Sequence, residues 1–293
     1  MTETSQPGPP WTILKLIRWT KGFFDDKGID SARLDAEVLL AHVLGLERIQ
    51  LYAQFDRPLN EDELAQFRAL VKRRAAREPA AYLVGHREFW SLDFHVDQRV
   101  LIPRPDTEVL VEACLERIDE DAAGRLVDIG TGSGAVAVAV ASERPNLQVA
   151  ATDASADALE VARQNAARLL PERKIEFFEG DLLDALPTDW RPVDMVVSNP
   201  PYVAEPERAE MEADVLDFEP ADALFAGDDG LDLIRRLIPQ AKEALKPGGW
   251  LLFEIGYRQG DAARKLLEDQ GFSEVEIIKD YGRRDRVAAG KCR

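Results

Sequence analysis

The spacing of apolar residues divides the chain into two regions of different character. In the first region apolar residues recur three and four positions apart, as in Ile13, Leu16 and Ile17, which predicts short amphipathic helices. Because no strand-like alternation interrupts this pattern before residue 85, we expect a helical N-terminal domain over residues 1–84.

One of these helices carries signals at both ends. Asn60 followed three positions later by Glu63 predicts a capping box at its start. Its last turn and the residues beyond hold a basic cluster: Lys72, Arg73, Arg74 and Arg77. Basic side chains favour the negative end of a helix, so we interpret the cluster as a solvated face, with contact to an acidic protein partner as the alternative.

From residue 85 the periodicity changes. Apolar residues alternate with polar ones from Glu88 to Leu101, which predicts a β-hairpin that links two domains over residues 85–101. Beyond it, strand-like and helix-like segments alternate, which predicts an α/β domain over residues 102–293 with a mostly parallel sheet covered by helices on both faces. Strands are expected at 125–130, 148–153, 174–179, 193–198, 249–255, 274–279 and 286–290, and helices near 107–118, 134–143, 156–168, 228–245 and 259–269.

Length and composition narrow the class of protein. A chain of 293 residues with 45% hydrophobic residues is large enough for two globular domains. Its apolar runs are shorter than a membrane span requires and its N-terminus does not resemble a signal peptide, so we expect a cytoplasmic protein. Cys114 and Cys292 form no Cys-x-x-Cys pair and the three histidines lack metal-ligand spacing, so no metal site is predicted.

The charge balance bears on the partner. A net charge of −17 argues against binding to naked nucleic acid, because phosphate contacts require a basic surface. Residues 98–293 hold 24 Lys and Arg against 39 Asp and Glu, so most of the acidity belongs to the predicted α/β domain. A protein or small-molecule substrate is favoured, and we expect a monomer with no direct nucleic-acid or membrane partner.

The first predicted strand of the α/β domain runs into a glycine-dense turn. This turn consists of Gly130, Thr131, Gly132, Ser133 and Gly134. Glycine lets the backbone turn tightly and approach a ligand, and such turns at the carboxyl end of a parallel strand bind nucleotide-like ligands. The turn alone does not distinguish a nicotinamide dinucleotide from S-adenosylmethionine.

Acidic residues near the strand ends add to this site. Asp153 ends the second strand, where a carboxylate can accept both ribose hydroxyls of either ligand. Asp128, two residues before Gly130, would attract the cationic ammonium group of S-adenosylmethionine and repel a pyrophosphate, which favours the methyl donor. After the third strand, Asp181 is placed to accept from the adenine amino group and Leu182 to pack on the ring, with a helix N-cap as the alternative for Asp181.

The fourth strand delivers Asn199-Pro200-Pro201-Tyr202 at its carboxyl end, which is a catalytic position in such a sheet. The side-chain oxygen of Asn199 and the carbonyl oxygen of Pro200 can each accept one N–H of a planar amide or amine, which holds the nitrogen lone pair towards a sulfonium methyl group. As the N–C bond forms, the two acceptors stabilise the developing positive charge. Tyr202 offers a ring on which a flat group can stack. The alternative for the tetrapeptide is an ordinary proline turn without a catalytic role.

Several motifs together resemble the HemK/PrmC family, the methyltransferases that modify a glutamine of bacterial peptide chain release factors. The resemblance covers nearly the whole chain. It rests on the glycine turn, on the Asn-Pro-Pro-Tyr tetrapeptide, and on the segments 85–92, 101–108 (Leu-Ile-Pro-Arg-Pro-Asp-Thr-Glu) and 253–256 (Phe-Glu-Ile-Gly). The Ile-Pro-Arg-Pro-Asp-Thr-Glu run distinguishes this family from the adenine methyltransferases that share the tetrapeptide.

The resemblance implies a class I, Rossmann-like methyltransferase sheet of seven strands, preceded by a small helical domain that helps to bind the release factor. It implies transfer from S-adenosylmethionine to the amide nitrogen of the glutamine in the Gly-Gly-Gln motif. The residues implied to hold the donor are Gly130 to Gly134, Asp153, Leu182 and Asn199, and those implied to hold the glutamine are Asn199, Pro200, Pro201 and Tyr202. Leu182 departs from the family, because some relatives have an aromatic residue there.

Two rival functions remain, and the roles of Arg104 and of the acidic residues 203–230 each have an alternative interpretation. A DNA adenine-N6 methyltransferase would use the same acceptors, although the acidity argues against it, and a non-catalytic donor-binding module is the rival from another class. Arg104 is expected either to pair with Asp106 or Glu108 or to order the donor's carboxylate. Residues 203–230 hold ten acidic residues against Arg208 alone, which indicates solvated surface or, alternatively, a mobile loop near the substrate.

Overall fold

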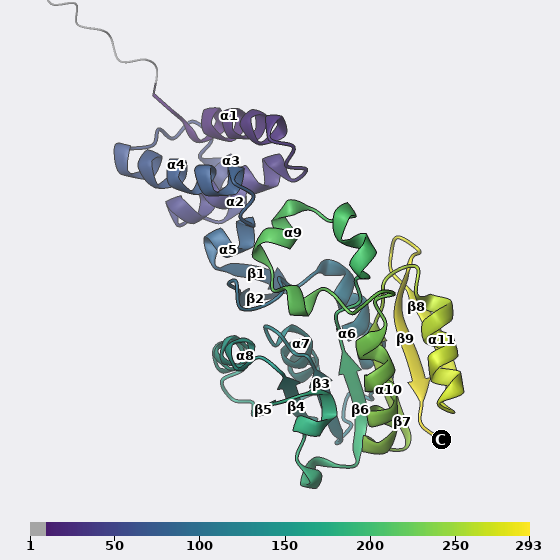
Figure 1. Cartoon of the computed structure of the whole chain (residues 1–293). Coiled ribbons are helices and arrows are strands. Elements are labelled where there is room, and N and C mark those ends of the chain that lie inside the picture. Colours follow the sequence, from purple (N-terminus) through teal and green to yellow (C-terminus); the bar gives the residue numbers. More distant parts are fainter. Residues whose placement is uncertain (1–9) are drawn as a thin grey trace, which may run out of the picture. The chain divides into compact units, whose positions relative to one another are not determined.

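The computed structural model describes residues 10–293, so the first nine residues of the predicted helical domain lie outside the described residues. The described chain divides into two compact units, which Figure 1 shows with the sequence running from purple to yellow. The helical unit comprises the described residues up to Gly85 together with Ala213–Phe218, and the sheet unit comprises His86–Glu212 and Glu219–Arg293. The predicted hairpin therefore lies with the sheet unit, and its role as a linker stays a prediction.

Short amphipathic helices build the helical unit, as their spacing predicted. They are α1 (Ile13–Asp26), α2 (Ala32–Leu44), α3 (Arg48–Ala53), α4 (Glu61–Ala75) and α5 (Ala80–Val84). Buried residues such as Ile13, Phe24 and Leu40 form their common core. The capping box of α4 is confirmed, because the Asn60 side chain accepts from the Glu63 amide at 2.9 Å and the Glu63 carboxylate accepts from the Asn60 amide at 2.9 Å.

The helix α9 (Ala213–Phe218) also belongs to the helical unit, although it comes from the acidic stretch after the tetrapeptide. Its Asp214 carboxylate pairs with Arg74 at 2.6 Å, and Arg74 pairs with Asp35 at 2.6 Å. Arg74 is only 4% exposed. The interpretation of the basic cluster as a solvated face is therefore wrong for Arg74, which neutralises two carboxylates inside the unit.

The predicted α/β architecture is confirmed in the sheet unit, where the described residues form a sheet of seven strands. Its order is β5-β4-β3-β6-β7-β9-β8, in which β9 runs antiparallel to both neighbours. The strands are β3 (Arg125–Ile129), β4 (Gln148–Asp153), β5 (Ile175–Glu179), β6 (Val193–Ser198), β7 (Leu245–Glu254), β8 (Ser273–Lys279) and β9 (Asp285–Lys291). The strands β1 (His86–Phe89) and β2 (Leu92–His95) form the predicted hairpin as a separate antiparallel pair.

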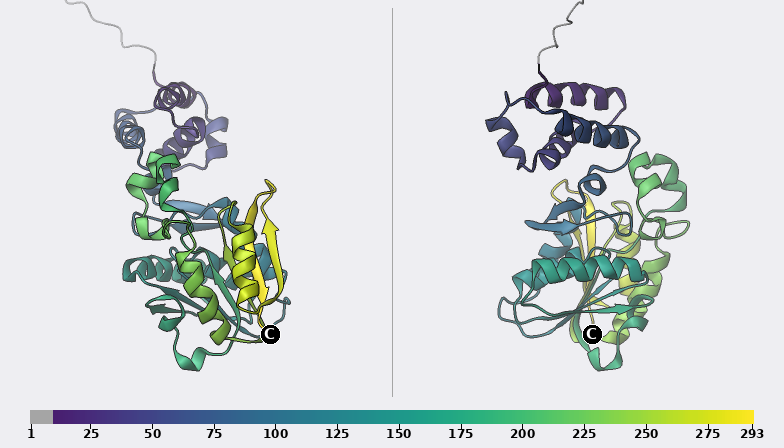
Figure 2. Two further views of the ribbon diagram at one scale, coloured as in Figure 1. Left: turned by 45° about the vertical axis from the view of Figure 1, so that its right-hand side comes forward. Right: turned by 90° about the vertical axis from the view of Figure 1, so that its left-hand side faces the viewer.

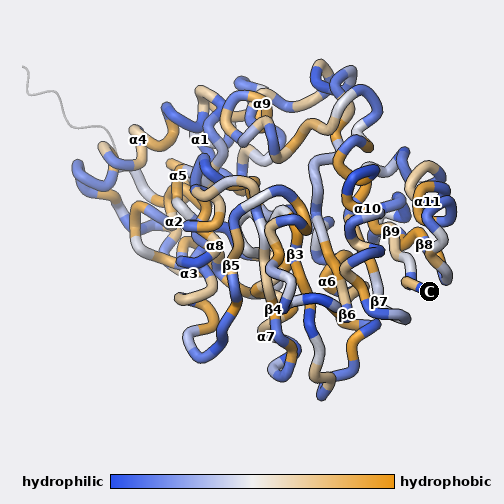
Figure 3. Tube along the Cα trace, turned by 60° about the horizontal axis from the view of Figure 1, so that its bottom comes forward, coloured by the Kyte–Doolittle hydropathy of each residue, from blue (hydrophilic) through white to orange (hydrophobic). Residues whose placement is uncertain are grey.

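Helices cover both faces of this sheet, as Figure 2 shows. One face carries α6 (Glu108–Leu115), α7 (Ala135–Glu143) and α8 (Ala156–Leu169), and the other carries α10 (Asp232–Ala244) and α11 (Gly260–Asp269). Because both faces are covered, the central strands are nearly continuous hydrophobic runs, which appear as orange segments of β3 and β6 in Figure 3. None of the described helices is long and apolar enough to cross a membrane.

Several boundaries differ from the prediction: β7 begins at Leu245 rather than at residue 249, α6 ends at Leu115 rather than near residue 118, and two helix starts differ for local reasons. The helix predicted from residue 228 begins at Asp232, because Gly227 and Gly230 have φ of 80° and 72° and keep the chain in a turn. The helix predicted from residue 107 begins at Glu108, after a short 3-10 turn over Pro105–Thr107. These turns bring Thr107 and the segment before α10 to the edge of the sheet where the strands end.

The position of the site follows from the strand order. Strands β3 and β6 are parallel neighbours, with Ile129 opposite Ser198, although they are far apart in the sequence. The chain order reverses between them, because β4 lies on the other side of β3. Parallel sheets have a crevice at the carboxyl ends of the strands at such a reversal. The glycine turn and the tetrapeptide therefore leave adjacent strands at the same edge.

Candidate functional site

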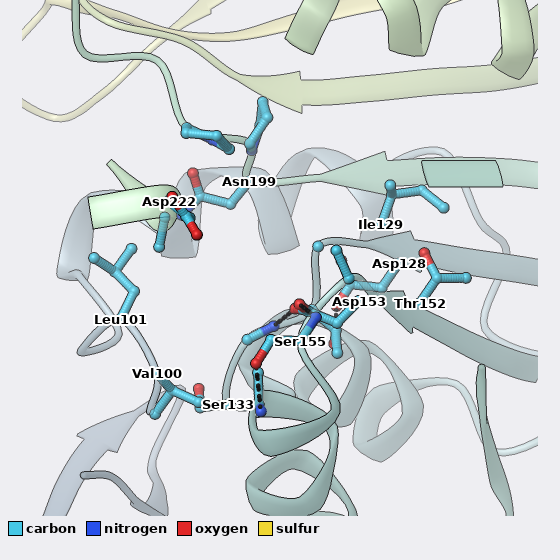
Figure 4. Close-up of a pocket in the computed structure, with 18 of the residues that line it drawn as sticks. Val100, Leu101, Asp128, Ile129, Ser133, Thr152, Asp153, Ser155, Asn199 and Asp222 are labelled. Atoms are coloured by element: carbon cyan, nitrogen blue, oxygen red, sulfur yellow. Dashed lines mark hydrogen bonds between the residues drawn. The ribbon is translucent and has the colours of Figure 1, made fainter. Parts of the chain in front are cut away.

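A cavity of about 510 Å³ lies at this edge of the sheet and is lined entirely by residues of the sheet unit. Figure 4 shows Asp153, Ser133 and Ser155 on one side of it and Asn199, Asp222 and Leu101 on the other. The predicted site residues that line it are Gly130, Thr131, Gly132, Ser133, Asp153, Asp181, Leu182, Asn199, Pro200 and Pro201. The structure thus brings most of the predicted site together, and Gly134 and Tyr202 are not among the lining residues.

The glycine turn has the backbone conformation that its sequence predicts. Gly130, Gly132 and Gly134 have φ of 67°, 56° and 83°, which side chains rarely adopt. A Cβ on Gly130 or Gly132 would meet no atom within 4 Å, so backbone conformation is what requires glycine there. Gly134 instead packs against Ala162 of α8, where an added Cβ would lie 3.3 Å from the alanine Cβ. Its role is to start α7 close to α8, and a contact with the donor stays a prediction.

The Asp153 carboxylate links β4 to the glycine turn. It accepts from the Gly132 amide at 2.9 Å and from the Ser155 amide at 2.9 Å, as the dashed lines in Figure 4 show. Burial raises its pKa, although these amide hydrogen bonds oppose the rise. Each carboxylate oxygen has two lone pairs, so both oxygens can still accept from a ligand in the cavity.

Asp128 also lines the cavity and is 1% exposed. Its Oδ2 accepts from the Thr131 hydroxyl at 2.6 Å and from the Ala137 amide at 3.2 Å. Burial raises the pKa of Asp128 to about 7, and the nearby Asp153 charge also raises it. Asp128 therefore gains or loses a proton near neutral pH according to the charge that enters the cavity.

Asp181 and Leu182 follow β5 at the far side of the cavity. The Asp181 carboxylate makes an ion pair with Arg236, and it makes no capping hydrogen bond to the 3-10 turn Leu182–Ala185. Leu182 is buried with a φ of 50°, and its carbonyl oxygen accepts from the Thr152 hydroxyl at 3.1 Å. Leu182 thus offers an apolar surface to the cavity, whereas Asp181 already has a cationic partner.

The tetrapeptide is held at both ends by residues to which sequence reasoning assigned no role. The side-chain nitrogen Nδ2 of Asn199 donates to the Thr107 hydroxyl oxygen at 3.2 Å. The Tyr202 hydroxyl donates to Glu254 at 3.1 Å, and burial raises the pKa of Tyr202 well above its ordinary value. Thr107 and Glu254 both lie in motifs that carry the family resemblance, and this is the signal that pointed to them. Stacking of a substrate on Tyr202 stays a prediction.

Arg104 pairs with neither of the acids expected for it. Its guanidinium binds Glu219, a carboxylate 115 positions away whose side chain is 1% exposed, and Glu219 also accepts from the Ile102 amide at 3.2 Å. Asp106 pairs instead with Arg286 at 2.9 Å, and Glu108 accepts from the Trp90 amide at 2.9 Å. The expectation of local pairing is wrong because the chain folds a distant acid onto this segment.

The acidic stretch 203–230 is more ordered than solvated surface would be. It forms 3-10 turns over Glu205–Glu210 and Ala221–Ala223 as well as α9. Glu219 is buried, and Asp222 lines the cavity beside Asn199 in Figure 4. The interpretation as simple solvated surface is therefore wrong for Glu219, whereas Asp222 is exposed at the cavity.

Comparison with known proteins connects this geometry to a family. Residues 15–85 match the PrmC N-terminal domain and residues 106–218 match the methyltransferase small domain. A solved methyltransferase from Pyrococcus furiosus shares the fold, with a TM-score of 0.51 at 17% sequence identity over 76% of this chain and 96% of that chain.

Two curated relatives match at much higher identity. The release factor glutamine methyltransferase of Burkholderia pseudomallei is 47% identical over 293 residues, which cover 99% of this chain and 99% of that protein. The release factor glutamine methyltransferase of Geobacter sulfurreducens is 44% identical and matches 96% of this chain and 97% of its own length. Identity at this level over the full length shows common descent and a common fold. The chain belongs to the release factor glutamine methyltransferase family.

Proposed function

We propose that this methyltransferase transfers a methyl group from S-adenosylmethionine to the side-chain amide nitrogen of the glutamine in the Gly-Gly-Gln motif of peptide chain release factors. The observation that carries this proposal is that Asn199 and Pro200 line the same cavity as the glycine turn. A donor bound on the glycine turn would therefore present its methyl group beside two hydrogen-bond acceptors. A DNA adenine-N6 methyltransferase does not explain why residues 15–85 match the PrmC N-terminal domain.

The cavity suits the donor in size and in chemistry. Its volume of about 510 Å³ lies within the range of about 300–1,000 Å³ for ligand pockets. In the proposal Asp153 accepts the two ribose hydroxyls, residues 130–133 line the path of the methionine part, and Asp128 attracts the ammonium group. Leu182 packs on the adenine. The adenine amino group is assigned to Asp181, which would have to share its ion pair with Arg236.

The acceptor half of the site is assigned to the tetrapeptide. Asn199 donates through its nitrogen to Thr107, so its Oδ1 remains free to accept one N–H of the substrate amide. Pro200 carries its carbonyl oxygen on a backbone stiffened by two prolines, and this oxygen accepts the second N–H. Two fixed acceptors hold the amide plane and leave the nitrogen lone pair facing the donor.

The donor supplies an electrophilic sulfonium methyl group. An amide nitrogen is a weak nucleophile because its lone pair is delocalised, so the residues act by orientation and by stabilising charge rather than by removing a proton first. As the nitrogen becomes positive, its protons become more acidic and their hydrogen bonds to Asn199 and Pro200 strengthen. A proton then leaves to water, and S-adenosylhomocysteine and the methylated amide remain.

The substrate is a folded protein, so a recognition surface outside the cavity is part of the proposal. We assign it to the helical unit, which matches the PrmC N-terminal domain over residues 15–85. We also propose a monomeric enzyme that works in the cytoplasm, where release factors act, and that binds no nucleic acid directly.

Label transfer tests this function. The purified enzyme is incubated with labelled S-adenosylmethionine and either release factor, the factor with its Gly-Gly-Gln glutamine replaced by alanine, or adenine-containing DNA. The proposal predicts one methyl group on the glutamine of the unmodified factor and none on the variant or the DNA. Labelling of the DNA, or equal labelling of the glutamine-lacking factor, would overturn it.

A further inference from the structure

A buried carboxylate lies directly behind the tetrapeptide and has no part in the mechanism described so far. Glu254 ends β7, which pairs with β6 through Ser198 and Phe253, so it lies beside the point where the tetrapeptide begins. It is 1% exposed. Burying a carboxylate costs free energy unless it is paired, so its partners indicate what it does.

Glu254 can only accept hydrogen bonds when it is ionised, and the Tyr202 hydroxyl donates to it. Its Oε1 accepts from the Tyr202 hydroxyl at 3.1 Å. Burial raises the pKa of Glu254, the Thr107 hydroxyl opposes that rise, and Oε2 has no hydrogen-bond partner among the described residues. Arg286 lies 4.0 Å from Oε1 and balances the charge.

The hydrogen bond from Asn199 gives the contacts behind the cavity a direction. Because the Thr107 hydroxyl oxygen accepts from the Asn199 side-chain nitrogen at 3.2 Å, its own proton is free to be donated elsewhere, and we assign that proton to the Glu254 carboxylate. Asn199 must then turn its Oδ1 away from Thr107. If the Asn199 side-chain amide were reversed, its NH₂ group would face the N–H groups of the substrate, and no hydrogen bond could form between them.

We propose that Glu254 and Thr107 are positioning residues that orient the Asn199 amide so that its oxygen faces the substrate nitrogen, an inference that rests on the function proposed above. Glu254 holds Tyr202 at the other end of the tetrapeptide through the same carboxylate. One buried group thus fixes both ends of the segment that carries the Pro200 carbonyl. Neither residue exchanges a proton with the substrate in this account.

Isosteric substitutions separate this role from a structural one. Glu254→Gln places an NH₂ group opposite Thr107, and Thr107→Val removes the hydroxyl while Thr107→Ser restores it. Both Glu254→Gln and Thr107→Val are expected to lower kcat on release factor about tenfold to a hundredfold, with the KM for release factor and donor affinity changed less than about threefold. Thr107→Ser is expected to recover most of kcat. The double variant is expected to lose little more than either single variant, because both act through Asn199.

Asp280→Asn is the matched control. Asp280 binds the same Arg286 at 3.2 Å but does not hold the tetrapeptide, so the kcat of this variant is expected to stay within about twofold of the parent enzyme. Arg286 also keeps Asp106 at 2.9 Å when Glu254 is replaced, so Glu254→Gln leaves it an anionic partner. Thermal midpoints are measured for every variant, and if Glu254→Gln does not fold, the valine and serine variants of Thr107 decide the question.

The outcomes also separate this inference from the proposed function. A parent enzyme that does not methylate the release factor contradicts the function itself. A parent enzyme that is active, with folded Thr107→Val and Glu254→Gln variants of unchanged kcat, overturns the positioning role alone. The positioning role is also overturned if Thr107→Ser is as slow as Thr107→Val, or if Asp280→Asn slows the reaction as much as Glu254→Gln does.

Discussion

Asp153 has two roles that one substitution would remove together. Its carboxylate holds the Gly132 and Ser155 amides, and the proposal adds the ribose hydroxyls. Asp153→Ala is expected to weaken donor binding by about 2–3 kcal/mol, or roughly 30-fold to 150-fold, because hydrogen bonds to a charged acceptor are lost. Asp153→Asn keeps one acceptor oxygen and is expected to lose about half of that free energy. Titration calorimetry measures both, and unchanged donor affinity in a folded Asp153→Ala variant removes Asp153 from the donor site.

Asp128 is expected to make donor binding depend on pH. Burial raises its pKa to about 7, so between its ordinary value of 3.8 and about 7 the folded protein holds a proton that the unfolded chain has released. The contribution of Asp128 to stability therefore falls as pH rises through this window. A cationic ammonium group in the cavity favours the ionised carboxylate, so donor binding is expected to release protons and to weaken as pH falls from about 7.5 to about 6.

Calorimetry in two buffers of different ionisation heat measures this proton release. Asp128→Asn is the control, because it cannot ionise and is expected to bind the donor weakly at every pH. Donor binding by the parent enzyme without proton release near pH 7 would show that no cationic group reaches Asp128.

The positions of the site residues could be predicted, but their partners could not. Asn199 and Asp153 were found because residues at the carboxyl ends of parallel strands share one edge, which the chain order alone implies. Thr107 and Asn199 are 92 positions apart, and Tyr202 and Glu254 are 52 apart. Which polar side chain meets which depends on how the elements pack, and periodicity contains no information about that.

At the scale of elements, the turn before α10 holds the tetrapeptide in place. Gly230 has a φ of 72°, and a Cβ there would overlap the carbonyl oxygen of Tyr202. Gly230→Ala is therefore expected to shift the tetrapeptide and lower kcat at least tenfold, besides its cost in stability. Gly248→Ala is the control, because its φ is 81° but a Cβ would meet nothing within 4 Å.

Both substitutions carry the strain of a left-handed conformation, which costs about 1–2 kcal/mol. Thermal unfolding measures that shared cost, and the rate on release factor measures the displacement of the tetrapeptide. Equal kcat values for the two alanine variants would mean that the contact between Gly230 and Tyr202 has no influence on the reaction.

Some buried parallel strands were predicted more closely than the start of α10 or of β7. Buried parallel strands such as β4 and β6 are apolar runs bounded by polar residues, and both were predicted with the bounds that the structure has. The start of α10 was missed because a helix-like pattern continues through a glycine turn that helical periodicity does not detect. The helix α9 was missed because it has only six residues, too few for a helical period to be recognised within the acidic stretch around it.

At the scale of the whole molecule, the chain passes from the helical unit to the sheet unit at the end of α9. This helix packs in the helical unit, and Glu219, the residue that follows it, belongs to the sheet unit. Arg74→Met would leave Asp35 without its buried partner, while Asp214 keeps Arg77 at 3.4 Å, and it is expected to destabilise the helical unit by about 3 kcal/mol. Methylation of whole release factor is expected to fall more than methylation of a short Gly-Gly-Gln peptide, with donor affinity unchanged.

Arg73→Met is the matched control on the same helix. Arg73 pairs with Glu78 and its side chain is 55% exposed, so its loss is expected to cost less than about 1 kcal/mol. If both variants have the same thermal midpoint and the same activity on whole factor, the buried ion pairs of Arg74 contribute neither to stability nor to methylation of the factor. Loss of activity on the peptide as well would place the effect of Arg74 in the chemistry rather than in recognition.

The central claim is that Asn199 and Pro200 orient the substrate amide, and kcat of Asn199→Asp on release factor tests it most directly. Aspartate keeps the shape and an acceptor oxygen but loses the N–H that binds Thr107 at 3.2 Å, so the side chain is no longer held in alignment. Its charge attracts the sulfonium in the ground state, which does not speed the reaction. The account predicts a kcat at least about a hundredfold lower, with donor affinity and thermal midpoint nearly unchanged. A near-normal kcat in the folded variant would contradict it.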